Sequence, residues 1–411
     1  MSPALYSNIK AVGSHNKMIF RLSNPIKNFE WGCKYALSEL FGIPNPDMRP
    51  QAELWMGAHS NGSSHIKIRG EELSLADAIN SDSAYWLGEQ MEKGIEQLPF
   101  LVKILAANQP LSIQVHPSKV AAETGFEKEN AQGIAFDSPE RNYKDSNHKP
   151  ELVYAITPYL AMNGFRQLDE IHKLFSAMEL PSVELILEPF LANPSRKTLE
   201  RLFAAVLQLD ESEKQQAISE LLSFDSSKNY STEVVEAFQL ITELAKLYPN
   251  DVGLFSPLFL NIIELHPGEA MFLYAETPHS YLKGVGVEVM ANSDNVLRAG
   301  LSPKYIDVPE LIANTKFESI KPSDLKMEPI KQGERLIYPI PVEDFKFDII
   351  DDAILDITVL SPEILLCVNG TAEIKTEQNC VTLKAGESVM IPAATSSYSL
   401  NSQGVVARTY C

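Results

Sequence analysis

The sequence predicts a mostly β protein with an α-helical insertion, made of two β-sandwich or jelly-roll domains and one all-α domain. Residues 18–160 consist mainly of short apolar segments bounded by turn residues, which is typical of β structure. Residues 168–248 instead place apolar side chains at helical spacing, and short β-rich segments return from about residue 250. A chain of 411 residues also exceeds what one hydrophobic core usually supports, so several domains are expected.

The first β domain is expected to be discontinuous. Its strands are predicted at residues 19–22, 64–68, 100–105, 152–156, 259–265, 270–273 and 286–290. A helix over 74–79 begins with Ser74, a residue type that caps helix N-termini well. We therefore predict one domain built from residues 18–165 and 252–325.

The insertion, residues 166–251, is predicted to be all-α. Apolar residues follow helical spacing at positions 168, 171, 174 and 175, at 199, 202, 203 and 206, and at 234, 238, 241 and 244. Glycine is absent from 167 to 251, as suits helices.

Residues 326–411 are predicted to form the second β domain, with strands at 345–350, 363–368, 372–375, 381–383 and 388–391. Asn369-Gly370 indicates a hairpin. Gly386-Glu387 leads into an apolar strand just as Gly268-Glu269 does in the first domain, so we infer two related β-sandwiches. No histidine follows the second turn, and this domain is predicted to carry no chemistry of its own.

The composition restricts the binding partners and the cellular location that we expect for this protein. The net charge of −19 argues against nucleic acid or an anionic membrane surface, although a local cluster of Lys and Arg can still hold a phosphate. No apolar run approaches 18 residues and no secretory signal is recognised, so we expect no membrane span. The four scattered cysteines are typical of reduced thiols, and the predicted location is cytoplasmic.

Residues 109–119 contain the first candidate for chemistry. Apolar residues alternate here with Ser112, Gln114 and His116, so one face of a strand presents a hydroxyl, an amide and an imidazole. Gln114 and His116 stand side by side and are a plausible half of a metal site. The alternative is a half-exposed strand whose polar face meets water.

The second candidate is the segment 147–151, Asn-His-Lys-Pro-Glu. Pro150 favours an extended conformation for Lys149, so Lys149 and Glu151 are expected to point to one side of the chain. His148 lies between Asn147 and Lys149. The alternative is a charged turn ahead of a strand.

Two further segments offer polar groups. His279 follows the strand at 270–274 and is preferred as a ligand over His266, which adjoins a Pro-Gly turn and is expected to meet solvent. The polar loop at 291–304 supplies Asp294, Arg298 and Lys304, unless it is only a solvated connector.

Together these groups match one metal site. Two imidazoles, one carboxylate and one amide oxygen suit zinc, which accepts nitrogen and oxygen donors. With a single carboxylate the centre keeps a positive charge and can polarise a carbonyl group. The long separations between ligands exclude a zinc-finger arrangement.

At this point the chain resembles the type I phosphomannose isomerases of the cupin superfamily. The resemblance extends over nearly the whole chain from about residue 18, and its motifs occur in the family's order at 28–32, 52–57, 109–119, 147–151, 278–282 and 293–304. It implies two cupin-like domains and one Zn²⁺ held by Gln114, His116, Glu151 and His279. Ser280 departs from the usual alanine, a change that should not affect the metal.

The resemblance implies reversible interconversion of mannose 6-phosphate and fructose 6-phosphate through a cis-enediol. Arg298 is expected to stabilise the enediolate charge, either Lys149 or Asp294 to act as the base, and His148 to assist ring opening. Candidates for the phosphate site are Ser112, Lys119 and Lys304, and candidates for supporting the pocket are Glu53 and Trp55.

The expected partner is a small sugar phosphate, and the chain is expected to be a monomer. Two other classes stay open from the residues alone. One is an iron-dependent oxygenase or oxidase, which favours two histidines and one carboxylate. The other is a sugar-binding protein without catalysis.

Overall fold

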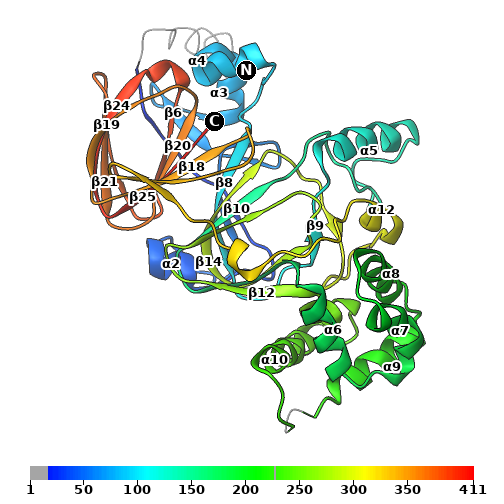
Figure 1. Ribbon diagram of the computed structural model, residues 1–411. Coiled ribbons are helices and arrows are strands. Elements are labelled where there is room, and N and C mark those ends of the chain that lie inside the picture. The colour runs from blue at the N-terminus through cyan, green and yellow to red at the C-terminus, as the bar shows by residue number, and fades with distance from the viewer. Residues whose placement is uncertain (1–16, 226–227) are drawn as a thin grey trace.

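The computed structural model describes residues 17–225 and 228–411 and divides them into three regions (Figure 1). A central β region lies between a second β region, drawn in orange and red, and a group of helices, drawn in green. The prediction of a mostly β chain with a helical insertion is confirmed. Within the described residues, no helix is long and apolar enough to cross a membrane.

The central region is built around one long strand, β14 (His279–Ala291), which belongs to two layers. Its first part pairs with β11 and β9, and its second part pairs with β8 and β10. Gly284 lies where the strand changes partners. Its φ is +128°, and a Cβ there would lie 2.6 Å from the Pro158 carbonyl oxygen.

The other strands of this ten-stranded sheet are β2 (Ile26–Lys27), β3 (Glu53–Met56), β8 (Phe100–Ala107), β9 (Gln114–Val115), β10 (Glu151–Ala155), β11 (Tyr159–Phe165), β12 (Leu260–Leu265), β13 (Ala270–Leu273) and β15 (Leu297–Arg298). The sandwich therefore gathers strands from both sides of the helical insertion.

Hairpins and short helices surround this sheet. The predicted helix at 74–79 is confirmed as α3, where the Ser74 hydroxyl accepts a hydrogen bond from the Asp77 amide. The elements are α2 (Ala36–Phe41), β4 (Ala58–His59), β5 (Gly62–Ser63), β6 (His65–Ile68), β7 (Glu71–Ser74), α3 (Leu75–Ser81), α4 (Ser83–Leu87), η1 (Gly88–Lys93), α5 (Lys119–Ala131), α12 (Val308–Ala313) and η4 (Pro322–Asp324).

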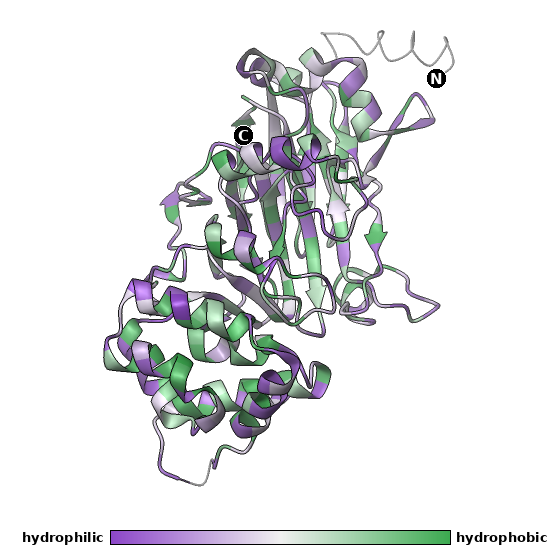
Figure 2. Ribbon diagram, turned by 90° about the vertical axis from the view of Figure 1, so that its right-hand side faces the viewer, coloured by the Kyte–Doolittle hydropathy of each residue, from purple (hydrophilic) through white to green (hydrophobic). Residues whose placement is uncertain are grey.

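The insertion is all-α, as its spacing predicts. Its elements are α6 (Leu168–Ala177), η2 (Pro181–Val183), α7 (Glu184–Ala192), α8 (Arg196–Leu207), α9 (Glu211–Leu222) and α10 (Thr232–Leu247). Two more short helices, η3 (Val252–Phe255) and α11 (Ser256–Phe259), follow the predicted end of the insertion at residue 251. Figure 2 shows these helices grouped at one end of the molecule. Phe203 of α8 packs against Phe165, Phe259 and Phe317, and this cluster joins the helices to the central sheet.

The second β region packs a seven-stranded sheet against a four-stranded one. Its strands are β16 (Ile330–Gln332), β17 (Arg335–Tyr338), β18 (Lys346–Asp351), β19 (Ile354–Thr358), β20 (Glu363–Cys367), β21 (Thr371–Lys375), β22 (Cys380–Lys384), β23 (Ser388–Ile391), β24 (Ser397–Gln403) and β25 (Val405–Tyr410), with η5 at Ala393–Thr395. The seven-stranded sheet also includes β1 (Phe20–Arg21), which pairs with β23. The domain boundaries stay a prediction.

The prediction of a hairpin at Asn369-Gly370 is wrong. The flanking strands β20 and β21 belong to different sheets, so the turn connects the two layers instead of closing a hairpin. Gly370 has a φ of +69°, and the close approach of the Gln403 carbonyl leaves no room for a Cβ.

The two β regions share one hydrophobic core. Tyr154 of β10 packs with Tyr338 and Phe347 of the second region, with ring centroids 6.1 and 5.9 Å away. Strand β10 begins at Glu151, a residue of the candidate site. The second β region therefore packs against a strand that carries this residue.

Candidate metal centre and active site

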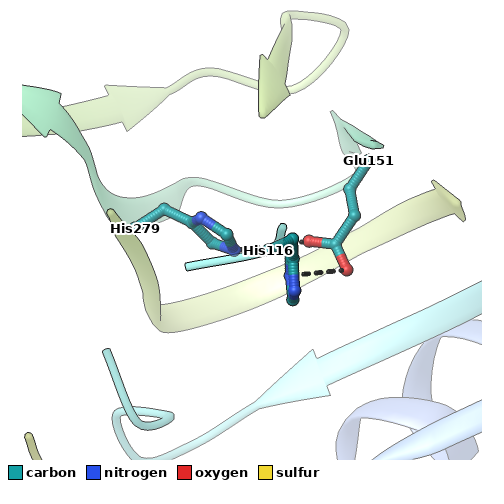
Figure 3. A group of neighbouring side chains, drawn as sticks. All are labelled: His116, Glu151 and His279. Atoms are coloured by element: carbon teal, nitrogen blue, oxygen red, sulfur yellow. Dashed lines mark ion pairs between the residues drawn. The ribbon is translucent and has the colours of Figure 1, made fainter. Parts of the chain in front are cut away.

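Three potential metal ligands converge inside the central sandwich. His116 follows β9, Glu151 begins β10 and His279 begins β14. All three are buried, and one ligand atom from each lies within 4.8 Å of the others. Figure 3 shows the two imidazoles and the Glu151 carboxylate close together, with dashed lines marking ion pairs between them.

Backbone carbonyls fix the tautomer of both imidazoles. The Nδ1 atom of His116 lies 2.7 Å from the Asn295 carbonyl oxygen, and that of His279 lies 2.9 Å from the Thr277 oxygen. A carbonyl only accepts, so each Nδ1 carries the hydrogen and each Nε2 keeps a free lone pair. These nitrogens lie 3.4 and 3.5 Å from the two oxygens of Glu151.

The protonation states also suit a metal. Burial lowers the pKa of His116 to about 4, so the ring is neutral at pH 7. Burial disfavours a charged Glu151, but Lys149 and His116 outweigh it and hold the pKa of Glu151 well below its usual range. The buried Nε2 of His116 has no hydrogen-bond partner among the described residues. Buried polar atoms normally have a partner, so this nitrogen is available to bind a metal ion. A neutral His116 imidazole beside an ionised carboxylate fits zinc.

Gln114 lies beside these three residues. It is the strand partner of His279 on one side and of Arg298 on the other. Its amide nitrogen donates to the Ser112 hydroxyl over 3.3 Å, which leaves the amide oxygen free. Gln114 lines one cavity with Glu151 and His279, so the structure brings the predicted ligands together. Ligation by Gln114 stays a prediction.

The same cavity contains charges that sequence reasoning missed. Lys103 of β8 is buried, its ammonium lies 2.6 Å from Glu288 and 3.9 Å from Glu53, and the Tyr281 hydroxyl donates to Glu151. A lysine inside the apolar run of 100–107 and a glutamate inside that of 285–291 were the available signals. A charge in the middle of a buried strand needs a partner, because isolated buried charges are costly.

Lys149 and Asp294 differ in their surroundings. Lys149 lines the cavity, with its ammonium 3.0 Å from Glu151. Asp294 lies in the loop after β14, where its backbone N–H donates to Asp145 and its carboxylate faces His59 and Asn61.

Arg298 is the strand partner of Gln114, and its charge acts on two lysines, Lys304 and Lys144. Burial lowers the pKa of Arg298, and burial followed by the charge of Arg298 lowers that of Lys304. The pKa of Lys144 is also lowered, first by burial and then by Arg141 and Arg298. Throughout the described part of the chain, none of the three pairs with a carboxylate, and an anion would relieve their mutual repulsion.

Two predicted site residues lie elsewhere. Because neighbouring side chains of an extended chain point to opposite sides, His148 points away from Lys149, and its Nε2 lies 2.8 Å from Asp344 of the second β region. Lys119 begins α5, and its ammonium contacts the Ser146 carbonyl and Glu123. His266 is exposed, as predicted.

Three family models match successive parts of the chain. They describe the type I phosphomannose isomerase catalytic domain (residues 19–168), the helical insertion domain of the same family (169–260) and the mannose-6-phosphate isomerase cupin domain (334–411).

Full-length relatives match as well. Mannose-6-phosphate isomerase of Escherichia coli K12 is 50% identical over 394 residues, covering 95% of this chain and 99% of that protein. The Homo sapiens enzyme of the same name is 34% identical, covering 91% of this chain and 93% of its own. A Salmonella typhimurium mannose 6-phosphate isomerase, whose crystal structure contains zinc and a bound substrate, aligns with a TM-score of 0.89 at 48% identity, covering 95% of this chain and 99% of that one.

These matches cover both β regions and the helical insertion, and they confirm the resemblance found in the sequence motifs. The chain is therefore an enzyme of the type I phosphomannose isomerase family.

Proposed function

We propose that this enzyme interconverts mannose 6-phosphate and fructose 6-phosphate through a cis-enediol, with one zinc ion held by Gln114, His116, Glu151 and His279. The observation that carries the proposal is the convergence of two Nε2 lone pairs on one ionised carboxylate. It is supported by the similar enzyme of Salmonella typhimurium, whose structure contains zinc and substrate. When bound, zinc supplies positive charge that polarises the sugar carbonyl.

The reaction moves a proton between C2 and C1 of the opened sugar. A base takes the proton from one carbon and returns it to the other, and we assign this role to Lys149 because its side chain lines the cavity. A lysine acts as a base only when nearby positive charge or burial favours its neutral form. Asp294 is the competing base.

Arg298 and Lys304, which pair with no carboxylate among the described residues, suit the negative charges of an enediolate and a phosphate. Arg298, next to Gln114 in the sheet, is proposed to stabilise the enediolate, because a guanidinium stays protonated and cannot accept the proton itself. Lys304 and Ser112 are proposed phosphate contacts. Lys144 suits this role less well, since its ammonium donates to the carbonyls of Phe136 and Ser138. Lys119 suits this role less well, since its ammonium already contacts Ser146 and Glu123.

A coupled assay tests the activity. Purified enzyme supplied with zinc should form fructose 6-phosphate from mannose 6-phosphate and catalyse the reverse reaction. His279→Ala should abolish both directions, while His266→Ala, a change of an exposed histidine, should leave them unaltered. No product from the zinc-supplied wild-type enzyme would refute the function and favour a sugar-binding role.

A cytoplasmic location and a monomeric state stay predictions. An oxygenase reaction is less consistent with the cations of the cavity. Activity that is unchanged without oxygen would separate the two classes.

A further inference from the structure

A hairpin beside the cavity contacts both oxygens of the Asp294 carboxylate. Asn61, in the turn between β4 and β5, donates from Nδ2 to Asp294 Oδ2 over 2.7 Å. His59, the last residue of β4, places its Nε2 atom 3.4 Å from Asp294 Oδ1. Each carboxylate oxygen therefore faces a nitrogen of the same hairpin.

The hairpin also determines which nitrogen of His59 carries the hydrogen. The backbone N–H of Asn61 donates to His59 Nδ1 over 3.1 Å, so Nδ1 is an acceptor and the hydrogen is on Nε2, toward Asp294. The ring is only 4% exposed, and its edge packs against Trp55 with centroids 5.1 Å apart. A flip of the His59 ring would break its contacts with both the Asn61 backbone N–H and the Asp294 carboxylate.

These contacts favour an ionised Asp294 carboxylate that stays partly exposed. Burial tends to raise its pKa, but the hydrogen bond from His59 and the charges of Lys149 and Lys103 outweigh burial and lower it. The Asp294 side chain is 36% exposed, compared with 3% for His59. The charges of Lys149 and Lys103, which line the cavity, act on Asp294, so its exposed carboxylate can accept a hydrogen bond from a molecule bound near them.

We propose that His59 and Asn61 are positioning residues, which hold the Asp294 carboxylate as the acceptor for a hydroxyl group of the sugar phosphate. This role rests on the isomerase function proposed above. It gives a reason for a buried histidine that is not among the proposed metal ligands.

Substitution of His59 tests the role. His59→Phe keeps an aromatic ring against Trp55 but removes the donor, and kcat/KM should fall about ten- to hundredfold, as for loss of a hydrogen bond to a charged group. His59→Gln, whose amide nitrogen can replace Nε2, should restore most of this loss. His65→Phe, at an exposed histidine of the next hairpin, is the matched control and should behave as wild type.

The pH profile separates positioning from simple destabilisation. Without its donor the Asp294 carboxylate should bind protons more readily, so the acidic limb of kcat/KM should move to higher pH in His59→Phe but not in His59→Gln. In an Asp294→Asn background His59→Phe should cost little more, because the two residues act as a unit. Additive losses together with an unshifted acidic limb would overturn the proposal.

Two further measurements keep the test decisive. If His59→Phe does not fold, Asn61→Ala removes the other donor and should shift the same limb in the same direction. The pKa of the Asp294 carboxyl, followed by ¹³C NMR and assigned with Asp294→Asn, should rise in the variant even if wild-type enzyme turns over no sugar phosphate. An inactive wild-type enzyme would therefore refute the proposed function, whereas an unchanged carboxyl pKa would refute the role of His59.

Discussion

His148 and Asp344 join two regions of the chain that are 196 residues apart. The Nε2 atom of His148 lies 2.8 Å from Asp344 Oδ2, and both side chains are largely buried. His148 immediately precedes Lys149, and Glu151 begins the strand that follows. The second β region thus holds the segment that supplies a metal ligand and the proposed base.

Loss of this contact should loosen that segment. Asp344→Asn is expected to lower the free energy of unfolding by about 1 kcal/mol, as for weakening of one hydrogen bond, and to lower kcat with it. The double variant with His148→Gln should be no worse than either single variant, since each removes the same contact. Urea unfolding and steady-state kinetics check this, with Asp356→Asn on exposed β19 as the control. Additive losses would instead show that His148 has a separate role, such as ring opening.

Lys149→Met should separate metal binding from proton transfer. Zinc content should stay near that of the wild type, because lysine is not a ligand, while kcat should fall by about a thousandfold with the loss of a general base. Metal analysis and the coupled assay measure the two effects on the same sample. Turnover near the wild-type rate would exclude Lys149 as the base and favour Asp294.

Lys304→Met should weaken recognition of the phosphate. The expected result is a rise of about tenfold in KM for mannose 6-phosphate with little change in kcat, since a contact far from C1 and C2 acts mainly in binding. Turnover of mannose without the phosphate should be unaffected. Equal losses for the two sugars would mean that Lys304 does not contact the phosphate.

Metal-free enzyme should lose stability as the pH falls. Burial holds the pKa of His116 at about 4 in the folded chain, compared with 6.5 for an exposed histidine. Between these values the unfolded state binds the extra proton, so the free energy of unfolding should fall by up to about 1.4 kcal/mol per pH unit as the pH drops. His116→Gln should reduce this slope, whereas His65→Gln should not, as measured by urea unfolding from pH 7 to pH 5. An unchanged slope in His116→Gln would contradict the lowered pKa of His116 in the folded chain.

Much of the site could be predicted because its residues occur in short motifs. Gln114, His116, Glu151 and His279 were all found in this way, and the structure brings them together. Helical spacing alone predicted the insertion, because its helices bury their apolar residues in one shared hydrophobic core.

The residues that were missed act through contacts that are distant in sequence. Lys103 and Glu288 meet only because β8 and β14 are paired in register, and Asn61 is 233 positions from Asp294. The turn at Asn369-Gly370 was misread because local turn chemistry does not reveal which sheet the next strand joins. Contacts between segments far apart in the sequence decided these features.

Metal content of the purified enzyme tests the central claim most directly. We predict about one zinc per chain, complete loss of isomerase activity after chelation, and recovery when zinc is restored. Removal of the metal should also lower the melting temperature of the wild type but not that of His116→Gln. An enzyme that contains no divalent metal, or that turns over mannose 6-phosphate equally well after chelation, would contradict the account.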